Sequence, residues 1–118
     1  MPKLIFFDTE TTGNTEKDFL VQIAYKSADK NNSESSESFA GLYKPEIKIP
    51  PEASAVHHIT NKMVADKPTF KESIDQPTIK KLFENLDSIV VAHNAPFDLM
   101  IIKKEEFTHT IFICAFVL

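Results

Sequence analysis

Two short apolar runs limit the folds open to this chain more than any other pattern in it. Residues 4–7 (Leu-Ile-Phe-Phe) and residues 88–92 (Ser-Ile-Val-Val-Ala) show little alternation between apolar and polar side chains. Such runs are typical of central strands that are buried on both faces of a sheet. We therefore predict central strands over residues 3–8 and 88–92, each followed directly by polar residues.

The segments after the first run predict an antiparallel meander. Residues 19–26 alternate in polarity, and residues 38–43 form a further strand that Pro45 ends. Between them, residues 29–37 are rich in Asn, Ser, Lys and Glu, which indicates a long hairpin tip. Strands that follow one another through such short links pair antiparallel.

Helical signals begin in the middle of the chain. Pro50 and Pro51 open a short helix near Ala53–His57, and a loop follows to about Ser73. An amphipathic helix is indicated by apolar residues at the spacing i, i+3, i+4 and i+7, namely Ile79, Leu82, Phe83 and Leu86.

A last helix and a last strand complete the expected order. Asn94 can cap a helix that has Pro96 in its first turn and exposes residues 103–106. Its expected inward-facing residues are Phe97, Met100 and Ile101. The apolar segment 111–118 predicts one more strand. The order β-β-β-α-α-β-α-β predicts an α/β fold, in which helices flank a mixed sheet within a single domain over residues 1–118.

Composition excludes several classes of protein. A formal charge of −4 argues against a broad basic surface that wraps nucleic acid, yet it permits a narrow site where bound cations supply positive charge. The single cysteine, Cys114, cannot form an internal disulfide, which favours a reducing, cytoplasmic setting. No apolar stretch of the sequence is long enough to span a bilayer.

Asp8 and Glu10 lie two residues apart at the end of the first predicted strand. Side chains at this spacing point to the same face, and ligands of α/β sheets favour the carboxyl ends of strands. Two crowded carboxylates repel each other, and a divalent cation such as Mg²⁺ or Mn²⁺ relieves that repulsion. The alternative is that the strand simply ends in solvated polar residues. Thr11, Thr12 and Gly13 extend the pattern with hydroxyls and flexible backbone suited to a phosphate or sugar.

Asp98 ends the segment His-Asn-Ala-Pro-Phe-Asp, which follows the second central strand. An acid in the first turn of a helix interacts favourably with the helix dipole, and Asn94 as an N-cap needs no further role. A purely structural explanation of this segment is therefore open. Because both acidic segments follow buried strands, however, three carboxylates are expected to converge on one rim. Two metal ions held there can orient a water and stabilise the leaving oxygen of a phosphodiester.

These two segments together resemble the DEDD (DnaQ-like) 3′-5′ exonuclease family. The strings are Phe-Asp-Thr-Glu-Thr-Thr-Gly from residue 7 and His-Asn-Ala-Pro-Phe-Asp from residue 93. Residues 51–63 are similar to the intervening segment of the branch that contains the proofreading subunit of bacterial DNA polymerase III. The resemblance spans nearly the whole chain. It implies a ribonuclease H-like fold, in which a three-strand meander is followed by parallel strands.

The resemblance also implies roles for individual residues. Asp8, Glu10 and Asp98 would be the catalytic carboxylates and the ligands of two Mg²⁺ or Mn²⁺ ions. The residues that would contact or enclose the 3′-terminal nucleotide are Thr11, His57, Ile59, Asn94 and Phe97. For Phe97 a place in the core is the alternative, and for His57 an ordinary loop position. His58 stands where the family usually has Gly, so a local difference in the backbone is expected.

The family further requires a His or Tyr base and a fourth carboxylate on a C-terminal helix. Only 20 residues follow Asp98, and none of them is Asp. His109 precedes the last predicted strand and is not assigned as the base. We therefore expect a domain that is incomplete at its C-terminus, lacks the last helices and has weak or absent activity. The expected apolar C-terminal strand would then need a partner, such as a second copy of the chain.

The leading interpretation is a 3′-5′ exonuclease that hydrolyses phosphodiesters by two-metal-ion chemistry. Its expected partners are the 3′ end of single-stranded DNA or RNA, with DNA favoured, and a DNA polymerase subunit. The alternative is a non-catalytic module that binds a nucleic-acid end or a protein. Another metal-dependent phosphoesterase is the third interpretation.

Overall fold

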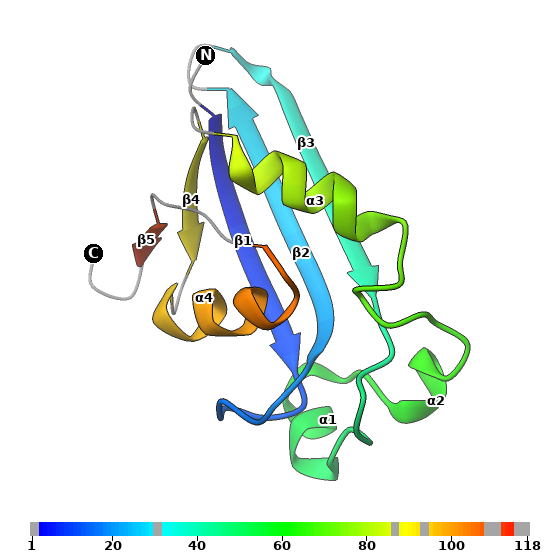
Figure 1. Cartoon of the computed structure of the whole chain (residues 1–118). Helices are drawn as coiled ribbons and strands as arrows, with labels where there is room; N and C mark the ends of the chain where they lie inside the picture. The colour runs from blue at the N-terminus through cyan, green and yellow to red at the C-terminus, as the bar shows by residue number, and fades with distance from the viewer. Residues whose placement is uncertain (1–2, 30–31, 86–87, 93–94, 108–111, 115–118) are drawn as a thin grey trace.

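A five-stranded mixed sheet with the order β3-β2-β1-β4-β5 forms the centre of the protein (Figure 1). The computed structural model describes residues 3–29, 32–85, 88–92, 95–107 and 112–114. The strands are β1 (Lys3–Thr11), β2 (Leu20–Asp29), β3 (Asn32–Leu42), β4 (Ser88–Ala92) and β5 (Phe112–Cys114). β2 pairs antiparallel with β1 and β3, whereas β4 runs parallel to β1 and β5 parallel to β4. The predicted α/β fold, a meander followed by parallel strands, is confirmed.

Helices cover one face of this sheet and one of its ends. They are α1 (Pro51–His57), α2 (Asn61–Val64), α3 (Asp75–Glu84) and α4 (Ala95–Lys104). Figure 1 shows α3 and α4 on the same face, and α1 and α2 beyond the end where β1 finishes. None of the helices in the described part of the chain is both long and apolar enough to cross a bilayer.

The main core lies between the sheet and the pair α3 and α4. Alternate residues of β1, Ile5 and Phe7, are buried against it, and the ring of Phe7 meets Phe83 of α3 edge to face at 4.9 Å. Phe107 also meets Phe83, at 5.3 Å, so much of the aromatic core is built from Phe. Burial of each such side chain stabilises the fold by about 1.5–3 kcal/mol.

The expectation that β1 is buried on both faces is wrong. Phe6 points away from α3 and α4 and is 48% exposed, and Asp8 on the same side is exposed too. The cause is the placement of the helices, because within the described residues both α3 and α4 pack on the Ile5 side of the sheet. Phe6 and Asp8 line an open, largely apolar hollow there.

The predicted hairpin tip over residues 29–37 is also wrong, because most of it is strand. Antiparallel pairing of β2 with β3 runs from Gln22 opposite Leu42 to Asp29 opposite Asn32. Pairing with β2 on both sides of an irregularity between Ser27 and Asp29 outweighs the low strand propensity of the Ser- and Glu-rich sequence. Residues 30–31 lie outside the described residues.

In the described part of the connection between β3 and β4 there are three helices, rather than the two expected. The added one is α2, a single turn in the stretch that was expected to be a loop. Thr60 caps it, since its hydroxyl accepts a hydrogen bond from the backbone N–H of Met63 at 3.3 Å. The expected amphipathic helix is confirmed as α3, with Ile79 and Phe83 buried; Leu86 lies outside the described residues.

α4 matches its prediction at the start and departs from it at the end. Ile101 is buried, and Phe97 and Met100 pack partly buried against the core, as expected. Glu105, by contrast, was expected to face solvent and is only 9% exposed. The chain turns back directly after α4, and the N–H of Phe107 donates to the carbonyl of Ile102, which folds Glu105 against the body of the protein. Asn94 and the residues of the last predicted strand outside Phe112–Cys114 lie beyond the described residues.

Candidate active site

The acid pair Asp8 and Glu10 lies near the carboxyl end of β1, on the sheet face that α3 and α4 leave open. Asp8 is opposite Ala24 of β2 and Glu10 is opposite Gln22. The two carboxyl groups are close enough to interact electrostatically. Desolvation by burial, followed by repulsion from Asp8, raises the pKa of the Glu10 carboxyl, and a positive charge on the nearby His57 would act in the opposite direction. The pair therefore holds a shared proton or a cation more readily than an isolated carboxylate does.

An irregularity in the sheet stands directly beside this pair. The register between β1 and β2 shifts between Glu10 and Thr11, and Thr11 is opposite Leu20. Val21 is thus the extra residue of the bulge, and both it and Leu20 are buried. Bulges bend a strand and redirect its side chains, and they are frequent beside active sites. Here the bulge lies at the end of β1, where His57 of α1 contacts the carbonyl oxygen of Thr11.

Asp98 reaches the same strand from the opposite side. It lies in the first turn of α4, is 4% exposed, and accepts a hydrogen bond from the Thr9 hydroxyl at 2.6 Å. Thr9 is the residue between Asp8 and Glu10, and its side chain points to the helix-covered face because strand residues alternate. Asp98 is therefore tied to the β1 segment that carries the acid pair.

The donor set of the acid pair suits a hard divalent cation, because two carboxylates share one place and one of them has a raised pKa. The three predicted acids nevertheless do not form one cluster. Among the described residues, no group of three or more His, Cys, Asp or Glu side chains is arranged to hold a metal ion. Asp8 and Glu10 are together, whereas Asp98 accepts the hydrogen bond of Thr9.

His57 ties α1 to the end of β1. Its Nε2 lies 3.1 Å from the carbonyl oxygen of Thr11, and its Nδ1 accepts the backbone N–H of Ile59 at 3.1 Å. A carbonyl can only accept, so Nε2 carries the hydrogen and the ring is the neutral Nε2–H tautomer. Ile59 itself is buried in a second core cluster with Val21. Both ring nitrogens are thus used within the protein.

His58 follows as the C-cap of α1, with φ 62° and ψ 17°. This left-handed conformation is the one that Gly adopts most readily, and a residue with a Cβ is strained in it. The His at this position therefore occupies a glycine-type backbone conformation.

A cavity of about 530 Å³ opens between β1, the loop after it, α1 and α4. We call it the site cavity; its lining residues are Thr9, Glu10, Thr11, Thr12, Gly13, Asn14, Pro50, Glu52, Ala53, Val56, His57 and Phe97. Its size falls in the usual range for small-ligand sites. Of the predicted nucleotide contacts, Thr11, His57 and Phe97 line this cavity. Ile59 is buried behind His57, and Asn94 lies outside the described residues.

The loop over residues 12–19 is organised by Asp18, which the sequence did not single out. The Asp18 carboxylate accepts hydrogen bonds from the Thr12 hydroxyl at 2.7 Å and from the backbone and hydroxyl of Thr15, both at 2.8 Å. Desolvation by burial opposes the charge, but these hydrogen bonds outweigh it and lower the pKa of the Asp18 carboxyl. No local periodicity marks Asp18, because its role depends on the closed shape of the loop.

The protein-family model described as RNase_T, exonuclease, matches residues 5–115. The chain belongs to this exonuclease family. It is 38% identical over 112 residues to a DNA polymerase III subunit epsilon-like protein of Rhodobacter capsulatus, covering 90% of this chain and 15% of that protein. It is 33% identical over 113 residues to the DNA polymerase III subunit epsilon of Treponema pallidum, covering 89% of this chain and 50% of the relative. The predicted resemblance to the DEDD exonucleases is therefore confirmed.

A solved exonuclease agrees with this family in three dimensions. Exonuclease X, in complex with 5′ overhanging duplex DNA, superimposes with a TM-score of 0.69 at 30% identity. The match covers 94% of this chain and 58% of exonuclease X. The ribonuclease H-like fold is thereby confirmed. The chain spans half or less of the length of the two polymerase III relatives.

Proposed function

We propose that this protein removes nucleotides from the 3′ end of a nucleic acid by hydrolysis, with the acid pair at the reacting phosphodiester. The observation that carries the proposal is the position of Glu10, which belongs to the acid pair and also lines the site cavity. A terminal nucleotide in that cavity would have its phosphate beside the two carboxylates. Membership of the exonuclease family supports the same reaction.

The proposed reaction adds one water molecule across one bond. The water oxygen attacks phosphorus, the bond from phosphorus to the 3′ oxygen breaks, and that oxygen takes up a proton. The products are a mononucleotide and a strand shortened by one residue. Mg²⁺ or Mn²⁺ bound at Asp8 and Glu10 would supply charge neutralisation and a lower pKa for the attacking water. Asp98 would join them as a further ligand or orient Thr9 beneath them.

The remaining cavity residues would bind and orient the terminal nucleotide. Phe97 offers an aromatic face for stacking, which is worth about 1–3 kcal/mol per base. The Thr11 hydroxyl donates to the carbonyl of Gly13 and so shapes the wall facing the sugar. His57 holds α1 in place through its two backbone contacts. Asn94 and Ile59 keep the binding roles that the family resemblance implies.

Slow turnover is proposed for this 118-residue chain. His57 lines the site cavity with Glu10, but its Nδ1 lone pair is occupied by the N–H of Ile59. It therefore has no free lone pair with which to accept a proton from water. If no other group acts as the base in place of His57, the rate falls by about 10²–10⁴-fold. DNA is proposed as the preferred substrate, and RNA is tested beside it.

The test is release of a labelled mononucleotide from the 3′ end of single-stranded DNA and RNA oligonucleotides, with Mg²⁺ or Mn²⁺ and with EDTA. We expect metal-dependent release, and a loss of at least about a hundredfold in Asp8→Asn and Asp98→Asn. Asp66→Asn, which removes an exposed acid just after α2, is the matched control. Release that persists in Asp8→Asn, or that needs no metal, contradicts the proposal.

A non-catalytic module that binds nucleic-acid ends is the second candidate. The hydrogen bond between Asp98 and Thr9 favours it, because it directs Asp98 away from a three-acid cluster. Titration with Mn²⁺ separates the two functions. A nuclease site binds Mn²⁺ and loses it in Asp8→Asn, whereas a docking module binds the oligonucleotide equally well without the metal.

A further inference from the structure

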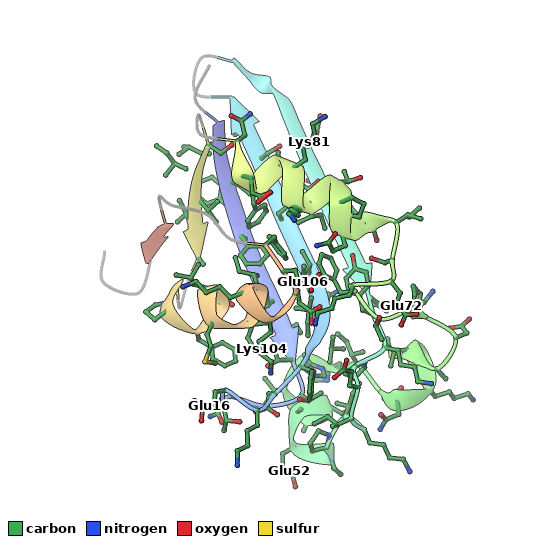
Figure 2. The ribbon with its side chains drawn as sticks, viewed as in Figure 1. Glu16, Glu52, Glu72, Lys81, Lys104 and Glu106 are labelled. Atoms are coloured by element: carbon green, nitrogen blue, oxygen red, sulfur yellow. The ribbon has the colours of Figure 1, made fainter. Side chains whose placement is uncertain are left out.

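Lys104, the last residue of α4, connects that helix to the loop over residues 12–19. Its ammonium donates a hydrogen bond to the carbonyl oxygen of Glu16 at 3.0 Å and another to the carbonyl oxygen of Asp18. It also lies 4.3 Å from the centre of the Phe19 ring. Figure 2 shows Lys104 reaching from the end of α4 toward the loop that carries Glu16.

These contacts satisfy loop carbonyls that β1 and β2 do not use. A lysine ammonium has three donors and no acceptor, so two carbonyls and an aromatic face suit it well. The position at the carboxyl end of a helix is also favourable for a positive charge. Hydrogen bonds that involve a charged group are stronger than neutral ones, so this link is a strong tie between α4 and the loop.

The loop end that Lys104 holds is continuous with a wall of the site cavity. Asp18, whose carbonyl Lys104 binds, uses its carboxylate to fix Thr12 and Thr15. A Cβ on Gly13 would lie only 2.5–2.6 Å from the Asp18 carboxylate oxygens, so Gly13 packs directly on that group. Movement of Asp18 therefore moves the stretch that lines the cavity.

The opposite end of α4 forms another part of the same cavity. Phe97 lines it, and Asp98 in the same turn is bonded to Thr9 of β1. α4 is thus attached to the β1 region at both ends, by Asp98 at its start and by Lys104 at its finish. The first attachment fixes Phe97, and the second fixes the loop that faces it.

We propose that Lys104 is a positioning residue for substrate binding, which holds the loop over residues 12–19 against α4 and keeps the two walls of the site cavity in a fixed relation. This inference rests on the proposed function, because it concerns binding of the nucleic-acid end. Lys104 itself touches neither the acid pair nor the cavity.

The test compares Lys104→Met, Lys104→Arg and Lys103→Met in the full chain. Met keeps the apolar stem beside Phe19 and removes the donors, whereas Arg keeps both the charge and the donors. Lys103 is the exposed neighbour on the same helix and serves as the matched control. Two quantities are measured: hydrogen exchange of the Thr12 and Thr15 amides by NMR, and the Kd for a fluorescent single-stranded DNA by anisotropy with Ca²⁺.

We expect Lys104→Met to speed exchange of both loop amides and to raise the Kd about fivefold. Exchange of α3 amides should stay at the wild-type rate, which shows that the fold is intact. Lys104→Arg should restore both the exchange rate and the Kd, and Lys103→Met should change neither. If Lys104 only stabilised the fold, Lys104→Met would instead lower the Tm. The Kd, measured at a temperature well below the Tm, would then be unchanged.

Two results overturn the proposal. One is a Lys104→Met variant whose loop amides exchange as in the wild type. The other is a loop that loosens while the Kd stays unchanged. Failure of the proposed function gives a different pattern, because the wild-type chain then binds no oligonucleotide at all. If the wild-type chain binds no oligonucleotide, the role of Lys104 in substrate binding is overturned together with the proposed function. The exchange data still decide whether Lys104 holds the loop.

Discussion

The Thr9 hydroxyl donates a 2.6 Å hydrogen bond to the buried carboxylate of Asp98, across 89 positions of sequence. Through this bond the first turn of α4 is fixed to the β1 segment that carries Asp8 and Glu10. One strand thus presents an acid pair on one face and anchors a further acid on the other. The position of Asp98 relative to the pair depends on a residue that is not itself acidic.

Replacement of Thr9 by Val should destabilise the fold. Val keeps the branched shape and the strand preference, but it leaves the buried Asp98 carboxylate without this donor, which costs about 1–3 kcal/mol. Urea unfolding measures the free energy. Thr9→Ser is the control, because it keeps the hydroxyl and loses only a methyl group, at less than about 1 kcal/mol. Equal stability of Thr9→Val and the wild type would show that the bond contributes nothing.

Replacement of Glu10 by Gln should stabilise the protein at neutral pH. Burial and the neighbouring Asp8 raise the pKa of Glu10 above its ordinary value of 4.5, so the folded state binds this proton more tightly than the unfolded state does. The free energy of unfolding therefore falls as the pH rises from that ordinary value through the raised pKa, and it stays lowered above it. Gln does not titrate, so the Glu10→Gln variant avoids this loss in the free energy of unfolding. The difference in stability between the variant and the wild type should vanish below pH 4.5.

Chemical unfolding across that pH range measures the effect of Glu10→Gln. Glu84→Gln, which removes the exposed carboxylate at the end of α3, is the control variant, and the gain in stability from Glu10→Gln should exceed that from Glu84→Gln. A Glu10→Gln variant that is less stable than the wild type at neutral pH would contradict the role of the acid pair as a strained site.

Addition of a methyl group at Gly13 should disturb the loop through Asp18. The new Cβ would lie 2.5–2.6 Å from both carboxylate oxygens, and Asp18 cannot swing away without losing its bonds to Thr12 and Thr15. We expect Gly13→Ala to cost about 1–3 kcal/mol of stability. A double-mutant cycle checks the cause, because the added cost of Gly13→Ala should shrink in an Asp18→Ala background. Additive effects of the two substitutions would rule out this contact as the reason.

Glycine at position 58 should be more stable than the native histidine. His58 is exposed and has φ 62°, where a Cβ is strained. Relief of that strain outweighs the greater freedom of Gly in the unfolded chain by about 0.5–1 kcal/mol. Thermal unfolding should show a higher Tm for His58→Gly than for the wild type. The Tm of His58→Ala, which keeps the Cβ, should be unchanged. A gain in both variants would point instead to the imidazole.

The sheet, the acid pair on β1 and the place of Asp98 in the first turn of α4 could be predicted because they depend on local patterns, whereas the expected convergence of the three carboxylates is not found among the described residues. The run before Asp8 and the run before residue 93 each form a strand from their own sequence, and parallel pairing of β1 with β4 then follows from the order of the elements. The same patterns placed α3 and the start of α4. Phe6 was misjudged, since its exposure depends on which face the helices take, and a single strand does not encode that.

The loop network could not be predicted for a different reason. Lys104 binds carbonyls that lie 88 and 86 positions earlier in the chain, and backbone carbonyls carry no residue-specific signal. Asp18 and Glu105 likewise take their roles from turns that close only in the folded protein. The tautomer of His57 is another such case, because it follows from the two backbone groups that meet its ring.

The edge strand β3 has a consequence for solubility. In the described part of the sheet it pairs only with β2, so a row of its backbone donors and acceptors faces outward. A long unpaired edge is a template on which further copies of a chain can add and aggregate. β3 is rich in Ser, which has low strand propensity, and it exposes Glu37, whose charge opposes pairing with the same residue of a second copy. The Ser- and Glu-rich stretch of β3 thus disfavours the addition of further copies and the formation of fibres.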